Sequence, residues 1–205
     1  MKLYHCPNSR SLRPLWTLEE MGLPYELVTM EFPPRATYPG YLDINPLGTV
    51  PAFIDGNLTM TESTAICQYL VEKHGPHPIG VGADEPAYGE YLNWLHRSDA
   101  TLTFPLALVL RYSKLEPEAR RLPQVVDDYS QWFFSRLRSV ESALEGRQFL
   151  CADRLTIADI TVGFALFMGT RLGLDVRYKP NCQRYLADLM ARPAFARAQV
   201  FHVEN

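Results

Sequence analysis

The sequence contains few cysteines, no basic run and no long apolar segment, and each absence argues against a class of protein. Its four cysteines are far apart, without a Cys-x-x-Cys pair or a Cys/His cluster, so we expect reduced thiols and no metal site. No apolar stretch approaches the ~18 residues that span a bilayer, and the first residues lack the pattern of a signal peptide. The net charge of −3, without a basic patch, argues against nucleic-acid and membrane partners. Together these absences predict a cytoplasmic protein.

The chain of 205 residues is long enough for one large domain or two small ones, and its composition is that of an ordinary globular protein. Residues 76–86 contain three prolines and two glycines without periodicity, which is typical of a domain boundary. We therefore predict a first domain at 1–76, a linker at 77–86 and a second domain at 87–205.

The first of these domains alternates short strands and helices. Strand-like segments at 2–5 and 25–30 flank a helix that we expect to begin near residues 10–12 and to end at Gly22. This arrangement predicts a parallel strand pair with a right-handed crossover. The segments that follow predict an irregular stretch (32–41), a β-hairpin around Asp55-Gly56 and a helix (63–73). The domain is therefore predicted to be α/β, in the order β-α-β-β-β-α.

The second domain has the apolar periodicity of long helices and is predicted to be all-α. The expected helices cover 88–113, 127–144, a segment from Thr156, 182–191 and 195–200. Pro105 should kink or interrupt the first of them. Thr156-Ile157-Ala158-Asp159 is a capping-box pattern ahead of an apolar run, so we assign Asp159 to folding rather than to catalysis.

The loop before the first helix gathers several reactive side chains. Residues 6–11 read Cys-Pro-Asn-Ser-Arg-Ser, and Pro14, tolerated only in a first helical turn, fixes the helix start beside them. Ser9 or Ser11 is expected to cap the helix. Free N–H groups at the positive end of a helix, together with hydroxyls, an amide and a thiol, can hold an anion.

Four segments spread over the chain together form a recognisable pattern. They are Ser9–Trp16 with the following Leu18–Tyr25, Asn45–Pro51, Glu62–Leu70 and Leu155–Asp159. In this order and at these spacings, they resemble the cytosolic glutathione S-transferase family. The second resembles the family's loop with a cis-proline, and the third resembles its Glu/Gln-Ser motif. The resemblance implies a thioredoxin-like first domain that binds glutathione, a helical second domain that lines an apolar pocket, and a homodimer.

The resemblance implies where glutathione lies, and the chemistry of that peptide asks for the same residue types. Glu62 can pair with its α-ammonium, while the Ser63 hydroxyl and the N–H groups of the helix start can hold its carboxylate. Val50, extended before Pro51, can offer its backbone to the cysteinyl unit as an added strand would. The implied glutathione contacts are Asn8, Ser11, Thr49, Val50, Pro51, Glu62 and Ser63. The implied contacts of a small apolar electrophile are Phe104, Leu108, Arg111 and Tyr112.

The family patterns leave open which residue contacts the glutathione sulfur. Serine-type members and the bacterial and fungal Ser-Arg group favour Ser9, which we predict as catalytic, with Ser11 and Asn8 as alternatives. Tyr4 falls inside the first strand, where packing is expected. The cysteine of the beta class would fall at Arg10.

Two other functions compete with conjugation of glutathione. Cys6-Pro7-Asn8-Ser9 resembles the Cys-Pro-x-Cys/Ser motif of glutaredoxins and the Cys-Pro start of omega-class transferases, which implies a thiol-disulfide oxidoreductase that uses Cys6. Against this, Cys6 lies several residues before the predicted helix, and a buried, inert cysteine is the simpler interpretation. The fold also occurs in proteins that bind without turnover, so a non-catalytic binding module is the third hypothesis.

Overall fold

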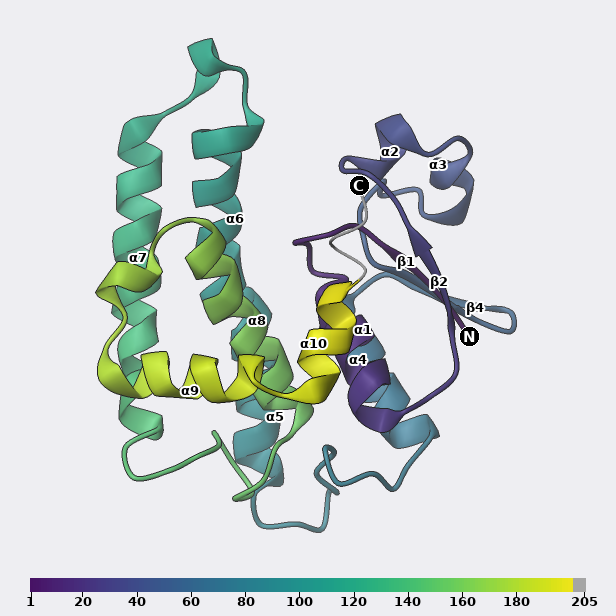
Figure 1. The fold of residues 1–205 in the computed structure, drawn as a ribbon, viewed down its shortest axis with the longest axis vertical. Helices are drawn as coiled ribbons and strands as arrows, with labels where there is room; N and C mark the ends of the chain where they lie inside the picture. Colours follow the sequence, from purple (N-terminus) through teal and green to yellow (C-terminus); the bar gives the residue numbers. More distant parts are fainter. Residues whose placement is uncertain (201–205) are drawn as a thin grey trace. The chain divides into compact units, whose positions relative to one another are not determined.

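The computed structural model describes residues 1–200 of the chain, and these form two compact units (Figure 1). The first unit is Met1–Gly80 together with the last helix, α10 (Pro193–Val200), and the second is Val81–Leu189. None of the described helices is long and apolar enough to cross a membrane.

Among the described residues, one sheet forms the centre of the first unit. Its strands are β1 (Lys2–His5), β2 (Glu26–Thr29), β3 (Ala52–Asp55) and β4 (Leu58–Met60), in the order β2-β1-β3-β4. β1 runs parallel to β2 and antiparallel to β3, and β3 and β4 form a hairpin. The predicted parallel pair and the predicted hairpin are therefore confirmed.

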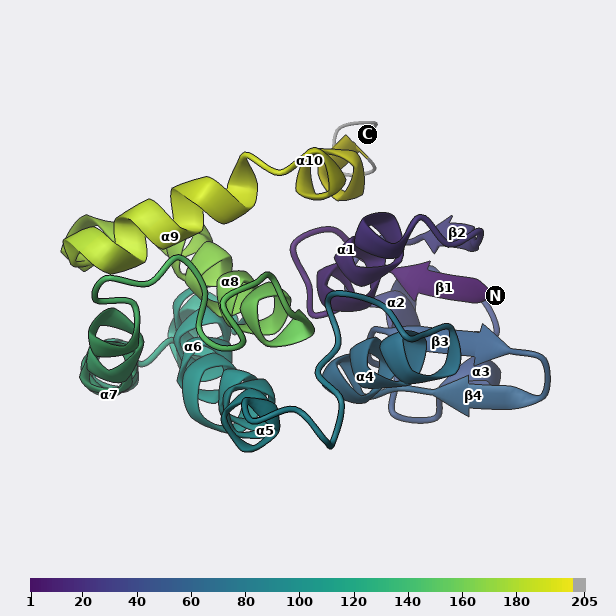
Figure 2. The same ribbon diagram turned by 90° about the horizontal axis from the view of Figure 1, so that it is seen from below.

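Helices α1 (Leu12–Met21) and α4 (Ser63–Lys73) lie side by side against the sheet (Figures 1 and 2). Both begin where the sequence predicts. α1 buries Leu15, Trp16 and Leu18, because apolar residues recur on one face at helical spacing. Gly22 ends α1 in a left-handed conformation, with φ of 62°, which a glycine adopts without steric cost.

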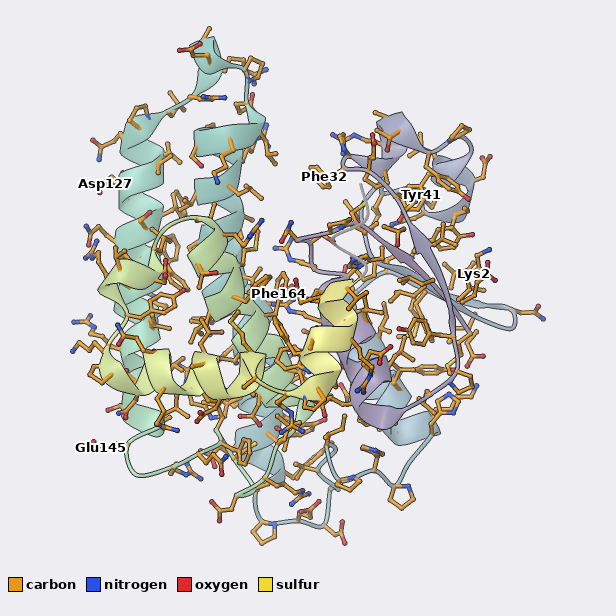
Figure 3. All side chains as sticks on the ribbon, in the orientation of Figure 1. Lys2, Phe32, Tyr41, Asp127, Glu145 and Phe164 are labelled. Atoms are coloured by element: carbon orange, nitrogen blue, oxygen red, sulfur yellow. The ribbon has the colours of Figure 1, made fainter. Side chains whose placement is uncertain are left out.

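The stretch predicted to be irregular contains two short helices, α2 (Pro34–Thr37) and α3 (Tyr41–Ile44), so that prediction is wrong. The reason is that Pro34 occupies the first turn of α2, the place in a helix that tolerates proline. Tyr41, labelled in Figure 3, is almost fully buried. Its hydroxyl donates a hydrogen bond of 2.6 Å to the carbonyl oxygen of Thr49. α3 therefore holds the loop that leads into β3.

The last helix, α10, packs on α1. The rings of Trp16 and Phe195 meet edge to face with their centroids 4.8 Å apart. Arg192, just before α10, donates to both carboxylate oxygens of Glu20, at 2.6 and 2.9 Å. The sequence assigned this segment to the second domain; in the structure its contacts group it with the first unit, because α1 offers it an aromatic ring and a carboxylate.

The second unit consists of helices, as predicted. They are α5 (Tyr88–Arg97), α6 (Phe104–Leu110), α7 (Pro123–Ala143), α8 (Ile157–Arg171) and α9 (Pro180–Met190), with short 3₁₀ turns at Glu118–Arg120 and Asp175–Arg177. α8 is apolar on all sides and nearly fully buried, so it forms the centre of this unit. α7 begins four residues earlier than predicted, because Pro123 serves as a first-turn residue.

Two π-helical turns interrupt the segment predicted as one kinked helix. One, Ser98–Thr103, joins α5 to α6, and the other, Arg111–Leu115, follows α6. Pro105 lies in the first turn of α6, directly after the first of them. Proline lacks an N–H and clashes with the preceding helical turn, so the wider π turn gives it room. The predicted interruption at Pro105 is confirmed.

The capping box at the start of α8 is present as predicted. One carboxylate oxygen of Asp159 accepts hydrogen bonds from the N–H (2.8 Å) and hydroxyl (2.9 Å) of Thr156. The other accepts from the N–H of Leu150 and the hydroxyl of Tyr185, both at 2.9 Å. Burial raises the pKa of Asp159 to about 6, although these hydrogen bonds favour the ionised form. Its contacts all belong to the helical unit, in agreement with a folding role.

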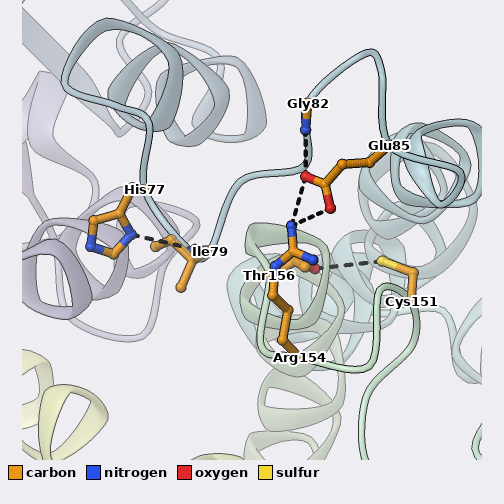
Figure 4. Close-up of polar contacts among 7 residues, drawn as sticks. All are labelled: His77, Ile79, Gly82, Glu85, Cys151, Arg154 and Thr156. Carbon is orange, nitrogen blue, oxygen red and sulfur yellow. Dashed lines mark hydrogen bonds and ion pairs between the residues drawn. The ribbon is translucent and has the colours of Figure 1, made fainter.

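The loop before α8 is tied to the start of the same unit (Figure 4). Arg154 donates to both carboxylate oxygens of Glu85, at 2.7 and 2.8 Å, and Glu85 also accepts from the N–H of Gly82 at 2.8 Å. Cys151 lies 3.7 Å from the hydroxyl of Thr156 in the same loop. The C-terminal part of the predicted linker is thus anchored by an ion pair.

Candidate active site

The loop between β1 and α1 holds two serine hydroxyls in contact. Ser9 Oγ and Ser11 Oγ are 2.7 Å apart, and Ser9 Oγ also donates a 2.7 Å hydrogen bond to the carbonyl oxygen of Cys6. Ser9 is half-buried, whereas Ser11 is fully buried. Of the two, Ser9 is therefore the hydroxyl that a ligand can reach.

Ser11 occupies the N-cap position of α1, but its side chain makes no capping hydrogen bond. Its hydroxyl instead accepts from the N–H of Cys6 at 3.2 Å and lies 2.8 Å from Nδ1 of His5. The prediction that Ser9 or Ser11 is the N-cap residue is confirmed for Ser11, although its side chain does not cap the helix, because both hydroxyls bond within the loop. The predicted start of the helix is confirmed.

Asn8 lies at the exposed tip of the loop, with φ of 57°. Asparagine is one of the few residues with a side chain that adopt this left-handed conformation readily. The turn therefore accounts for the choice of asparagine at this position without a ligand.

Cys6 is fully buried at the end of β1. Its thiol lies 3.6 Å from the carbonyl oxygen of Glu31, and burial raises its pKa to about 12. A thiol with this pKa is protonated at neutral pH, and the thiolate is the reactive form. The geometry therefore argues against an oxidoreductase that uses Cys6.

Two side chains donate hydrogen bonds to the backbone of the loop before β3. The peptide bond between Val50 and Pro51 is cis, as predicted. The carbonyl oxygen of Thr49 accepts from the side-chain amide of Asn45 at 2.7 Å and from Tyr41. Pairing of β3 with β1 begins only at Ala52, so Val50 lies beyond the paired part of the strand, where an extended ligand can add.

The start of α4 carries the pair Glu62-Ser63. Glu62 is exposed and makes no capping hydrogen bond with its side chain, so helix capping does not explain it. Ser63 is buried, and its hydroxyl accepts a 3.0 Å hydrogen bond from Nη1 of Arg13. Arg13 itself is fully buried in the first turn of α1.

The fold brings these three segments together at one end of the two central strands, β1 and β3. Because Tyr4 pairs with Ala52 in antiparallel strands, the end of β1 and the approach to β3 lie next to each other. The hydrogen bond between Arg13 and Ser63 joins the starts of α1 and α4. The sequence therefore identified the segments that meet, but it missed His5 and Arg13. The only sign of their importance in the sequence is that each is a polar residue in a segment otherwise expected to be buried.

The four residues predicted to contact an electrophile lie on α6 and the π turn after it. Tyr112 lines a cavity of ≈ 460 Å³ in the helical unit, together with Val126 and Phe134. Phe104 is 47% exposed, and its ring contacts those of Tyr129 and Trp132 on α7. Phe104 thus lies in an aromatic cluster rather than among the residues of that cavity.

The other two residues of this set differ in their surroundings. Leu108 is half-buried on α6. Arg111 pairs with Glu116 at 2.8 Å, and its guanidinium lies 5.6 Å from the centre of the Tyr112 ring. Over residues 1–200, no group of three metal-ligating side chains gathers, and the expectation of a metal-free protein stays a prediction.

Comparison with known proteins identifies the family of the chain. The models of the glutathione S-transferase N-terminal and C-terminal domains match residues 1–72 and 108–193. Glutathione S-transferase 4 of Zea mays is 32% identical over 89% of this chain and 83% of its own length. Glutathione S-transferase 3 of Schizosaccharomyces pombe is 28% identical, over 94% and 84%. The structure of the glutathione transferase URE2P6 from Phanerochaete chrysosporium, in complex with oxidized glutathione, is 26% identical, with a TM-score of 0.84 over 97% of this chain and 94% of that one.

The chain therefore belongs to the glutathione S-transferase family. The fold predicted from the motifs, a thioredoxin-like α/β domain followed by a helical one, is confirmed, and so is the predicted class of enzyme, a glutathione transferase.

Proposed function

We propose that the protein conjugates the thiolate of glutathione to small apolar electrophiles, with Ser9 as the residue that contacts the sulfur. The observation that carries this proposal is the partly exposed Ser9 hydroxyl just before α1. It lies at the end of the central strands where Val50 and the start of α4 also lie. The oxidized glutathione bound in the related URE2P6 structure supports glutathione as the co-substrate.

The two ends of the glutamyl residue of glutathione fit the start of α4. Glu62 is exposed, so its carboxylate can pair with the α-ammonium. α4 is 11 residues long, and its first N–H groups with the Ser63 hydroxyl can hold the α-carboxylate. The backbone of Val50 then takes the cysteinyl unit, which directs the sulfur toward the loop of Ser9. We place Asn8, Thr49 and Pro51 in contact with this ligand, whereas the buried Ser11 adjoins it only through Ser9.

Activation of the thiol is only part of the catalysis. Lowering the thiol pKa from ~8.5 to ~6.5 takes about 2.7 kcal/mol and raises the ionised fraction at pH 7 from about 3% to about 75%. The less basic thiolate loses roughly eightfold in nucleophilicity, so the net gain is about threefold. Most of the rate enhancement must therefore come from holding the electrophile next to the sulfur.

We propose that the helical unit supplies this positioning through Leu108, Arg111 and Tyr112. Tyr112 contributes an aromatic ring next to a cavity, and the Arg111 guanidinium next to that ring can attract an electron-rich leaving group. We reassign Phe104 to the aromatic cluster that it forms with Tyr129 and Trp132.

The test is conjugation of an activated aryl halide by wild type, Ser9→Ala and the control Ser142→Ala, which removes an exposed hydroxyl of α7. From the pKa values above, Ser9→Ala should raise the pKa of the bound thiol by about two units and lower kcat/KM at pH 7 by about threefold, with the control unchanged. Unchanged turnover in Ser9→Ala would remove Ser9 from this role. Retention on a glutathione column without any turnover would favour a binding module.

We also propose that the enzyme is a homodimer. Tyr129 and Trp132 stack with their ring centroids 5.3 Å apart, and Trp132 is 40% exposed. Arg136 lies over the Trp132 ring, 5.2 Å from its centre. Such a cluster of exposed rings next to a cation is typical of the centre of a protein interface. Light scattering should give about twice the chain mass of 23.4 kDa, and Trp132→Glu should give the single-chain mass. A wild type of single-chain mass would contradict the proposal.

A cytoplasmic location completes the proposal. All four cysteines are free and buried, which fits a reducing compartment. Cell fractionation with an antibody against the protein tests this location, and recovery in an oxidising compartment would contradict it.

A further inference from the structure

Three side chains form a row of hydrogen bonds from the interior of the first unit to its surface. His5 Nδ1 lies 2.8 Å from Ser11 Oγ, and Ser11 Oγ lies 2.7 Å from Ser9 Oγ. His5 and Ser11 are fully buried, and Ser9 is the half-buried end of the row. Ser9 Oγ makes one more short contact, 2.7 Å to the carbonyl oxygen of Cys6.

The number of hydrogens in this row decides which nitrogen of His5 is protonated. The three short contacts, His5 to Ser11, Ser11 to Ser9 and Ser9 to the Cys6 carbonyl, each need one hydrogen between the two atoms. Each hydroxyl supplies one hydrogen, and the carbonyl supplies none. The third hydrogen must come from His5. Nδ1–H therefore donates to Ser11, Ser11 donates to Ser9, and the Ser9 hydrogen points out of the row.

The opposite state of His5 would reverse this direction. An Nδ1 without hydrogen accepts from Ser11, and the contact between the two serines then needs the hydrogen of Ser9. That hydrogen would point into the protein, toward Ser11, and Ser9 could offer only lone pairs to an incoming anion. The state of one buried imidazole thus determines whether the exposed hydroxyl is a donor.

We propose that His5 is a positioning residue: its Nδ1–H, acting through Ser11, orients the Ser9 hydroxyl as a hydrogen-bond donor to the glutathione thiolate. This inference rests on the role proposed above for Ser9. When the sulfur arrives, the hydrogen of Ser9 turns from the neutral Cys6 carbonyl to the anion, and a charge-assisted hydrogen bond is the stronger of the two. Ser9 meanwhile keeps accepting from Ser11, which strengthens its own donation.

Two amide variants of His5 separate this role from simple packing. In His5→Asn the shorter side chain puts its amide near the place of Nδ1 and keeps an N–H donor for Ser11, whereas in His5→Gln the amide lies nearer the place of Nε2. We expect His5→Gln to raise the pKa of the bound glutathione thiol, measured by thiolate absorbance, by about one unit. At a pH below that pKa, kcat should fall by about three- to fourfold, because the more basic thiolate is also about threefold more nucleophilic. In His5→Asn, the pKa of the bound thiol and kcat should both lie close to their wild-type values. Equal losses in the two variants would overturn the proposal.

A double-mutant cycle tests whether His5 acts through Ser9. In the Ser9→Ala background, His5→Gln should leave the pKa of the bound thiol within about 0.3 unit, because the group that it orients is gone. A rise of about one unit in both backgrounds would overturn the inference. Should the His5 variants fail to fold, the protonation of Nδ1 in the wild type still tests the inference.

A measurement on the wild type needs no variant. Heteronuclear NMR of histidine-labelled enzyme saturated with glutathione should find Nδ1 of His5 protonated, and an unprotonated Nδ1 would overturn the inference. Binding of S-methylglutathione, which has no thiol, should be unchanged in His5→Gln. Failure of the wild type to bind glutathione or to conjugate it would instead overturn the proposed function, so the two failures are distinguishable.

Discussion

The buried guanidinium of Arg13 on α1 donates a hydrogen bond to the hydroxyl of Ser63 at the start of α4, with 3.0 Å between Nη1 and Oγ. Because Ser63 accepts from a cation, it keeps its single hydrogen for another acceptor. A positive charge next to the N-terminus of α4 also favours an anion at that place. Arg13 thus supports the site proposed for the glutathione α-carboxylate through Ser63.

Ser63→Ala should therefore have two effects. The loss of its hydroxyl removes one acceptor from the buried Arg13 guanidinium, which should lower the free energy of unfolding by about 1–3 kcal/mol. It should also weaken glutathione binding by about tenfold, because a hydrogen bond to a carboxylate is lost. Urea unfolding and calorimetry measure the two effects. Thr64→Ala, at the next and half-buried position, is the control. Unchanged stability of Ser63→Ala would contradict the first effect.

Cys6→Ser should leave conjugation of an aryl halide within about twofold of wild type, because a protonated, buried thiol takes no part in it. Burial raises the pKa of Cys6 and Cys67 to about 12 and that of Cys151 to about 11, and it also raises the pKa of Cys182. All four thiols should then resist a thiol reagent in the native protein and react in urea. Rapid labelling of Cys6 in the native state would reopen the redox alternative.

Asp159 should make stability depend on pH. Its pKa is about 6 in the folded protein, against an ordinary value of 3.8, so between these values the folded state binds more protons than the unfolded state. The contribution of this carboxyl to the free energy of unfolding is therefore full below pH 4 and falls by about 3 kcal/mol as the pH rises past 6. The stability of wild type minus that of Asp159→Asn, from urea unfolding, should fall by this amount between pH 4 and 7. A difference in stability that does not change with pH would contradict the raised pKa of Asp159.

Arg192 and Arg197, which both bind α1, should contribute unequally to the free energy of unfolding. Arg192 donates twice to Glu20, whose side chain is only 8% exposed, so Arg192→Ala should cost roughly 2 kcal/mol. Arg197 pairs at 2.6 Å with Glu19, but its own side chain is 54% exposed, so Arg197→Ala should cost less than about 1 kcal/mol. Thermal unfolding of the two variants compares them directly. An equal cost, or a larger one for Arg197→Ala, would be the contrary result.

The sequence predicted the segments of the fold well because their signals are local. Apolar periodicity and turn residues placed the strands and most helices, and the spacing of four motifs identified the family. The short helix α2 was missed because Pro33-Pro34 reads as a break, although a proline fits a first helical turn.

Within the candidate site, the sequence named residues but not their hydrogen bonds. It offered Ser9 and Ser11 as equivalent caps, whereas the two differ because one is half-buried and the other is bound to His5. The role of Arg13 depends on a contact with a residue 50 positions away, and no local pattern reports such a contact. The attachment of α10 to α1 escaped prediction for the same reason.

That attachment has a consequence for synthesis of the protein in the cell. Glu20 and Arg192 are 172 residues apart, and Glu19 and Arg197 are 178 apart. A chain made from its N-terminus presents α1 early, but the helix that covers Trp16 is translated only after the second unit. The first unit must therefore wait for the whole of the second to be translated before it is complete. During that interval an aromatic ring and two carboxylates on α1 are open to chaperones and to other nascent chains.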